Sequence, residues 1–255
     1  MADRLDGQVP ANRRRALVLA TGPGALVLLI GFFVTWALSF LVLAVVVGVV
    51  AGGAVTAAVR MAGPRIVIHL VGATPAGPDE QPRVHNLLDG LCVAAGVAKP
   101  EVLVVVDDAP NALVVANNQR RGALVVTTGL VEGLSRIELE GVLAHELSHL
   151  ESGDALPATV AVAALWPLVA VFPRAASLLE RLAGPDREER ADAAAASLTR
   201  YPPGLAQALA AVQRGGPPGQ GVPPGQGAAG RVTGHLWLGP PGQDLGGRVR
   251  ALRDL

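Results

Sequence analysis

The sequence predicts an α+β fold in which a small antiparallel sheet and several helices follow an N-terminal transmembrane helical hairpin. The stretch 16–59 near the N-terminus contains no charged residue. Three short runs rich in β-branched residues come later, at 101–106, 112–116 and 123–128. The segment 135–153 then repeats apolar residues at helical spacing. Together these patterns indicate a membrane anchor followed by a mixed domain.

The charge-free stretch 16–59 is long enough for two membrane spans, because one span needs about 20 apolar residues. We expect helices over 16–34 and 37–59, with a turn near Thr35 and Trp36. One long tilted helix or a re-entrant segment is the alternative.

Arginines flank the apolar stretch on both sides. Arg13, Arg14 and Arg15 precede it, and Arg60 and Arg65 follow it. Positive charge stays on the cytoplasmic side of a membrane, so both ends of a hairpin would lie in the cytoplasm. The sequence therefore predicts a multi-pass protein of the cell membrane, with a cytoplasmic tail over 1–15 and its catalytic domain facing the cytoplasm.

The composition supports a partner that is a lipid bilayer and argues against a nucleic acid. The chain is 51% hydrophobic and only 16% charged, and its formal net charge is zero. A nucleic-acid-binding protein would show a basic excess. Cys92 is the single cysteine, and it lies on the apolar face of a helix predicted over 83–96, so we expect it to be buried.

A helix is predicted over the segment that begins at Ser135. Ser135 and Glu138 have the spacing of a capping box, and Gly153 supplies a C-terminal stop. The apolar residues between them form one arc, which indicates that this helix borders the core. They are Leu139, Val142, Leu143, Leu147 and Leu150.

This helix contains the pattern His-Glu-x-x-His, with His145, Glu146 and His149. Residues four apart lie above one another on a helix, so the two imidazoles can bind one zinc ion. Glu146 falls beside the metal, where a carboxylate can take a proton from a zinc-bound water. The pattern therefore predicts zinc-dependent peptide hydrolysis. The alternative is a chance match formed by a buried histidine pair.

A third zinc ligand is predicted from the segment 186–192. Glu188 and Asp192 are again four residues apart on a predicted helix, so both carboxylates can share a face. One would bind the metal while the other fixes the orientation of a ligand imidazole.

Several blocks in order resemble the family of membrane zinc metallopeptidases that includes the HtpX heat-shock protease and the CAAX prenyl protease. The resemblance covers about 73–212. It rests on Pro110-Asn111-Ala112, Val126 to Leu130, Glu138 to His149, Asp154, and Glu188 to Asp192.

The resemblance implies a gluzincin-like zinc site with a role for each matching residue. His145, His149 and Glu188 would be the zinc ligands, with Glu146 as the base. Asp192 would be the catalytic partner that orients a ligand, and Asn111 would bind the substrate backbone.

The run that starts at Asn111 is also our candidate for an edge strand. An edge strand can receive a peptide substrate as an added strand, which gives binding that tolerates many sequences. The segment 111–116 is therefore expected to lie at the border of the sheet.

The apolar segment 155–172 leaves its path open. It is about long enough to span a membrane, yet it contains Pro157 and Pro167. One crossing would separate Glu188 from His149, so we favour a helix that packs on the domain or dips into the bilayer. HtpX-type relatives commonly place two spans here.

The remaining organisation follows from composition and from the family pattern. We expect a peptidase domain over 60–214, a Gly/Pro-rich flexible linker over 215–230 and a closing segment of the domain over 231–255. The His-Pro pair that relatives carry before Arg248 is absent, and His235 is a candidate substitute for its histidine.

The leading functional hypothesis is a membrane-anchored zinc endopeptidase that cuts membrane or misfolded proteins. A signalling metallopeptidase that acts on one regulatory partner is the first alternative. A zinc-binding pseudoenzyme is the second. Prenyl-peptide processing is disfavoured because the chain has too few apolar spans for an intramembrane chamber. The sequence leaves the oligomeric state open.

Overall fold

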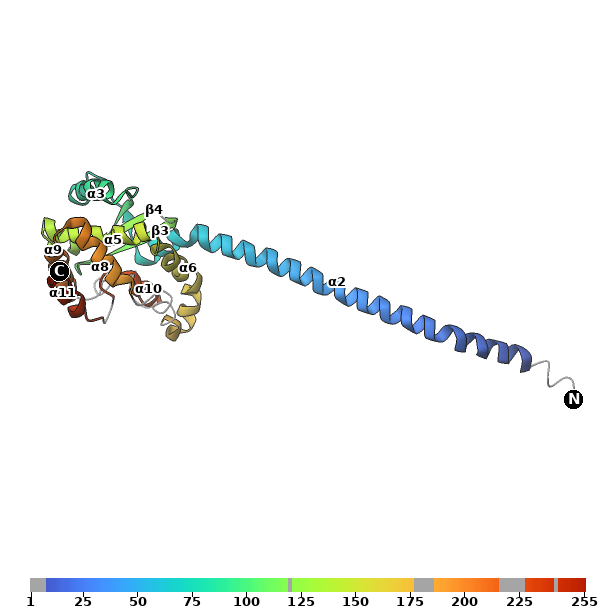
Figure 1. Ribbon diagram of the computed structural model, residues 1–255. Helices are drawn as coiled ribbons and strands as arrows, with labels where there is room; N and C mark the ends of the chain where they lie inside the picture. Colours follow the sequence, from blue (N-terminus) through green and yellow to red (C-terminus); the bar gives the residue numbers. More distant parts are fainter. Residues whose placement is uncertain (1–7, 119–120, 177–185, 216–227, 241–242) are drawn as a thin grey trace. The chain divides into compact units, whose positions relative to one another are not determined.

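A computed structural model divides the chain into two compact units, Met1–Thr56 and Ala57–Leu255 (Figure 1). It describes residues 8–118, 121–176, 186–215, 228–240 and 243–255.

The N-terminal apolar stretch belongs to one continuous helix, α2 (Gln8–Val71), so the predicted hairpin is wrong. The expected turn at Thr35 and Trp36 is helical. The Thr35 hydroxyl donates to the carbonyl of Gly31 one turn earlier, 2.8 Å away, which satisfies this polar group inside the helix. Trp36 contacts Phe33 and Phe40, which lie three and four residues away along the same helix.

Among the described residues, α2 is the one helix that is long and apolar enough to cross a membrane. The candidate span runs over Ala25–Val71, with a mean hydropathy of 2.6 in its most apolar window. The expectation that both ends of the apolar stretch face the cytoplasm depended on the hairpin turn, which the structure does not contain.

The sheet has four strands, and it is mixed rather than wholly antiparallel as predicted. The strands are β1 (Thr74–Pro75), β2 (Glu101–Val105), β3 (Ala112–Asn118) and β4 (Arg121–Thr127), in the order β1-β2-β4-β3. β3 pairs antiparallel with β4, but β2 pairs parallel with β4. The three predicted runs do form strands, and β3 lies at an edge as expected.

The parallel pairing depends on how the loop after β2 meets the end of β4. The Asp107 carbonyl accepts from the backbone of Gly129 and from the hydroxyl of Thr128. A side chain at Gly129 would approach the Asp108 carbonyl to 2.0 Å. The glycine therefore allows the carboxyl ends of β2 and β4 to lie side by side.

Helices cover both faces of the sheet (Figure 1). Val102, Val114 and Val126 face a core formed with α3, α5, α9 and α11. Leu103, Val115 and the other odd-numbered core residues of the strands face the end of α2, α6 and α10. The helices and short 3-10 turns after α2 are α3 (Pro82–Ala95), α4 (Thr128–Gly133), α5 (Arg136–Ser152), α6 (Ala155–Val171), η1 (Pro173–Ala175), α8 (Arg187–Thr199), α9 (Pro202–Gly215), α10 (Ala228–Thr233), η2 (Gly234–Leu236) and α11 (Gly246–Arg253).

Helix α3 carries the buried Cys92, which confirms that this thiol is a core residue.

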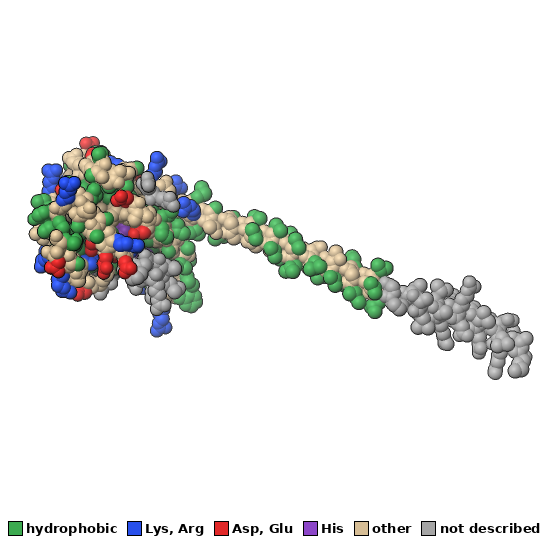
Figure 2. Space-filling view, in the orientation of Figure 1, with side chains coloured by type: hydrophobic (Ala, Val, Ile, Leu, Met, Phe, Trp, Pro, Cys, Tyr) green, Lys and Arg blue, Asp and Glu red, His purple; other side chains and the backbone are tan. Residues whose placement is uncertain are grey.

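Helix α6 packs on the domain through one face and exposes its far end. It bends by 84° from α5, and its buried residues include Ala158 and Val162. The large apolar side chains near its C-terminal end are exposed, and Figure 2 shows hydrophobic side chains at this place. They are Trp166, Leu168, Val171 and Phe172.

Candidate metal centre

Helix α5 holds His145, Glu146 and His149 in the interior of the domain. Their relative exposures are 0%, 2% and 3%. The predicted capping box at Ser135 and Glu138 starts the helix, and Gly153 ends it in the left-handed conformation. The local sequence thus fixes the helix that presents both imidazoles to the same region.

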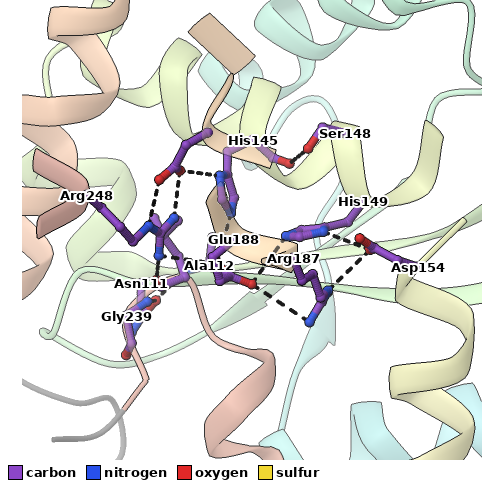
Figure 3. Close-up of polar contacts among 12 residues, drawn as sticks. Asn111, Ala112, His145, Ser148, His149, Asp154, Arg187, Glu188, Gly239 and Arg248 are labelled. Atoms are coloured by element: carbon purple, nitrogen blue, oxygen red, sulfur yellow. Dashed lines mark hydrogen bonds and ion pairs between the residues drawn. The ribbon is translucent and has the colours of Figure 1, made fainter. Parts of the chain in front are cut away.

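Helix α8 brings Glu188 to the two histidines. One carboxylate oxygen lies 3.4 Å from His145 Nε2, and the other lies 3.6 Å from His149 Nε2 (Figure 3). Since these residues precede and follow α6, the chain between them begins and ends on the same side of any membrane. A single crossing by 155–172 is therefore excluded.

The three side chains fit a metal ion. Their ligand atoms all lie within 4.8 Å of one another. Two ligand atoms that each lie about 2.1 Å from a tetrahedral metal ion are roughly 3.4 Å from each other. The distances from Glu188 to the two histidine nitrogens match this value. His145 Nε2 and Glu188 Oε2 are buried and have no hydrogen-bond partner among the described residues. Two imidazoles and one carboxylate are a donor set that suits zinc.

A carboxylate faces the other ring nitrogen of each histidine. His145 Nδ1 lies 2.9 Å from Asp192 Oδ1, and His149 Nδ1 lies 2.8 Å from Asp154 Oδ1. A carboxylate at Nδ1 keeps the proton on that nitrogen and leaves Nε2 free to bind a metal. Asp192 therefore lies where the sequence predicted, while sequence reasoning gave Asp154 no role.

Two arginines hold these carboxylates. Arg248 from α11 makes two bonds of 2.7 Å to Asp192, and Arg187 Nε lies 3.2 Å from Asp154. Arg248 Nη1 is also 3.2 Å from Glu188. Sequence reasoning assigned no site role to either arginine. For Arg187, its place directly before Glu188 was the only available signal.

Burial and neighbouring charges shift the pKa values of the two central groups. Burial alone lowers the pKa of His145, but Asp192 and Glu188 outweigh it and raise the value to about 9. For Glu146, burial raises the pKa to about 7. A pKa in this range is one that a general base can use near neutral pH.

The carboxylates around the histidines have lowered pKa values. Burial opposes this shift at Glu188, Asp192 and Asp154, but hydrogen bonds and nearby positive charges outweigh it. For His149, burial lowers the pKa despite its contact with Asp154. These carboxylates are ionised at neutral pH, and they supply the negative charge that a divalent cation needs.

Asn111 lies at the edge strand β3 and contacts the chain itself. Its side-chain nitrogen donates to the Gly239 carbonyl at 3.0 Å, and its side-chain oxygen accepts from the Gly239 backbone at 3.1 Å. The residue is fully buried. The Asn111 amide thus bonds to the backbone of the chain's own Gly239, and its contact with a substrate stays a prediction.

His235 lies in η2, and its Nε2 is buried without a hydrogen-bond partner among the described residues. Burial and the charge of Arg187 lower its pKa to about 4. It is therefore a neutral imidazole at physiological pH. Residues 216–227 of the linker predicted over 215–230 lie outside the described residues. The prediction is wrong for its two ends, because Gly215 ends α9 and residues 228–230 begin α10.

The fold and the site define a metallopeptidase: a helix with His-Glu-x-x-His beside a sheet, and a glutamate from a second helix. The family model described as Peptidase family M48 matches residues 78–245, more than half of the chain. The chain belongs to this family.

Curated relatives carry the name Protease HtpX homolog. The one from Dictyoglomus thermophilum is 33% identical over 181 residues, which cover 58% of this chain and 60% of the relative. The one from Streptococcus gordonii is 28% identical over 79% of this chain and 82% of the relative. The chain thus spans about 60% of the length of the Dictyoglomus relative. The HtpX-like resemblance inferred from the motifs is confirmed.

Proposed function

We propose that the chain is a zinc-dependent endopeptidase of the cell membrane that hydrolyses peptide bonds in membrane or misfolded proteins. The observation that carries this proposal is the meeting of His145, His149 and Glu188, with Glu146 buried on the same helix. The names of the relatives support a protease.

Zinc held by His145, His149 and Glu188 would polarise the scissile carbonyl and acidify the attacking water. Glu146 would accept a proton from that water and would donate it to the leaving amine. Its raised pKa suits both transfers, because the carboxylate is neither too weak a base nor too weak an acid near neutral pH. Asp192 and Asp154 keep the two imidazoles oriented.

Helix α2 would anchor the peptidase in the bilayer. We place the catalytic unit in the cytoplasm as part of this proposal. Arginines lie on both sides of the charge-free stretch, so the positive-inside rule alone does not orient a single span. The exposed apolar end of α6 would lie against the membrane surface. This placement suits substrates that emerge from the membrane or unfold near it.

Zinc content tests the metal site. Full-length protein purified in detergent is expected to hold about one zinc per chain, and Glu188→Ala is expected to lose it. Glu189→Ala is the matched control, because Glu189 is exposed on the same turn of α8. Zinc that is absent from the wild type, or unchanged in Glu188→Ala, would contradict the three-ligand site.

Catalysis is tested by Glu146→Gln. This variant should keep its zinc and lose cleavage of an unfolded protein such as casein, because the amide cannot accept the proton. A wild-type protein that binds zinc but cuts no unfolded substrate would instead favour a pseudoenzyme or a peptidase reserved for one partner.

A further inference from the structure

Strand β3 lies at the edge of the sheet, so every second residue points its backbone N–H and C=O away from β4. On its inner side the backbone of Asn111 bonds to Thr127, so the residues of odd number face β4. The backbone groups of even number therefore point away from the sheet. Ala112 and Ala116 are the first and third of these, and both already have partners. The Ala116 N–H donates to the hydroxyl of Thr159 in α6.

The partner of Ala112 is a short segment between η2 and α11. The backbone N–H of Leu238 donates to the Ala112 carbonyl at 2.8 Å. The next residue, Gly239, gives both its N–H and its carbonyl to the Asn111 side chain. All three bonds use only main-chain atoms of the segment. An extended peptide offers the same main-chain atoms.

This contact lies next to the candidate metal centre. Arg248 Nη1 donates to the Leu238 carbonyl at 2.9 Å, and the same nitrogen is 3.2 Å from Glu188 Oε2. One guanidinium therefore bridges the segment and a proposed metal ligand. Figure 3 shows Gly239, Asn111 and Arg248 grouped on one side of Glu188.

The segment is held closely where it lies. Leu238 is 1% exposed. A Cβ at Gly239 would approach Val212 Cγ1 of α9 to 2.3 Å, so only glycine fits this position in the observed arrangement. A substrate residue with a side chain could not take the place of Gly239 while α9 stays where it is.

We propose that Leu238–Gly239 is an internal occupant of the place at Asn111 and Ala112 where the edge strand would receive the main chain of an extended peptide. The inference rests on the proposed peptidase function. A substrate strand has to displace the segment before it can pair with β3, so the segment competes with substrate and lowers the activity of the resting protein.

Leu238→Pro weakens the occupant without changing any residue of the metal centre. Proline lacks the N–H that bonds to Ala112, and Trp237 before it is extended, with φ −73° and ψ 143°, which a following proline accepts. Leu238→Ala is the matched control, because it loses the buried side chain but keeps the N–H.

The binding measurement uses full-length Glu146→Gln protein, so that a fluorescein-labelled unstructured peptide stays uncut. Fluorescence anisotropy should show that Leu238→Pro binds the peptide about fivefold more tightly than Leu238→Ala, because both variants lose the buried side chain and they differ by one internal hydrogen bond. Leu238→Ala should gain less. Equal or weaker binding by Leu238→Pro, or no binding by any variant, would overturn the proposal.

Hydrogen exchange gives a second readout that needs no substitution in the segment itself. In the Glu146→Gln parent, the peptide should speed exchange of the amides of Leu238 and Gly239. Unchanged or slower exchange there would show that the segment is a fixed wall of the site, which overturns the inference. Zinc content of the same samples is measured separately. Its absence would count against the proposed function, whereas normal zinc with no displacement would count against the internal occupant alone.

Discussion

His145 and His149 each have a carboxylate behind the ring, and an arginine holds each carboxylate. The pairs are Asp192 with Arg248 and Asp154 with Arg187, and both arginines also approach Glu188. The two histidines therefore have matching surroundings although their partners come from different parts of the chain. This arrangement orients both Nε2 atoms toward the same point.

Removing Asp154 should weaken metal binding without abolishing it. Asp154→Ala leaves His149 without a partner at Nδ1, so we expect the zinc affinity to fall about 10- to 100-fold. Competition with a chromophoric chelator measures this affinity.

Asp154→Asn is the conservative variant, because it keeps an oxygen that can accept from Nδ1, and its loss should be smaller. Glu151→Ala is the control, since Glu151 is exposed on the same helix. An affinity that does not change in Asp154→Ala would show that His149 is oriented by packing alone.

At the residue scale, helical spacing was sufficient to predict which residues of α5 lie together at the site. It was insufficient to predict the residues that come from distant parts of the chain. His145, Glu146 and His149 share one helix, so their grouping is a local property of the sequence. The contacts of Arg248 with Asp192 and Leu238 join segments distant in the chain. Spacing within one helix cannot predict a contact between residues so far apart in the chain. Arg248 was therefore recognised only as part of the closing segment.

At the element scale, α5 and α9 approach closely because each contributes a glycine. A Cβ at Gly141 would come within 2.8 Å of the Leu205 backbone, and one at Gly204 would come within 2.9 Å of the Ile137 carbonyl. The neighbours are backbone atoms, which cannot rotate away. The packing of the metal-centre helix thus depends on two positions without side chains.

Gly141→Ala should destabilise the protein even though alanine favours helices. The extra methyl forces α5 and α9 apart, and overpacking of this kind costs about 1–3 kcal/mol. Thermal unfolding in detergent should show a lower Tm.

Gly90→Ala in α3 is the matched control, because a methyl there meets nothing within 4 Å. It should raise stability by about 0.5–1 kcal/mol through helix propensity. A Gly141→Ala protein as stable as Gly90→Ala would contradict the close helix contact.

The elements themselves were easier to predict than their pairing. The β-branched runs gave the three longer strands, and the capping signals gave the start of α5. The parallel alignment of β2 with β4 depends on the bonds between Asp107, Thr128 and Gly129, which form only in the folded chain. The antiparallel expectation failed because strand order is a tertiary property.

At the scale of the whole molecule, composition was sufficient to predict a candidate membrane helix near the N-terminus. It was not sufficient to show that this helix is continuous and not a hairpin. A charge-free stretch indicates a bilayer, but a turn in apolar sequence needs a residue that interrupts the helix. Thr35 does not interrupt it, because its hydroxyl bonds within the helix. Composition also left the path of 155–172 open, and the position of Glu188 excluded a single crossing.

The orientation of the catalytic unit can be tested with reporters fused after Leu255 in a bacterial host. We expect a fluorescent protein to be bright and alkaline phosphatase to be inactive, because the catalytic unit is proposed to face the cytoplasm, where alkaline phosphatase stays inactive. The same reporters fused at the N-terminus show whether α2 crosses once. Active phosphatase after Leu255 would reverse the proposed topology.

The contact between Arg248 and Asp192 also bears on the order in which the candidate metal centre is assembled during synthesis. A ribosome releases α5 first, then α8, and α11 with Arg248 comes last. Until α11 has emerged, Asp192 lacks its cation and the metal centre is incomplete. The nascent chain therefore makes this contact only after the helix that carries His145 and His149 has been synthesised.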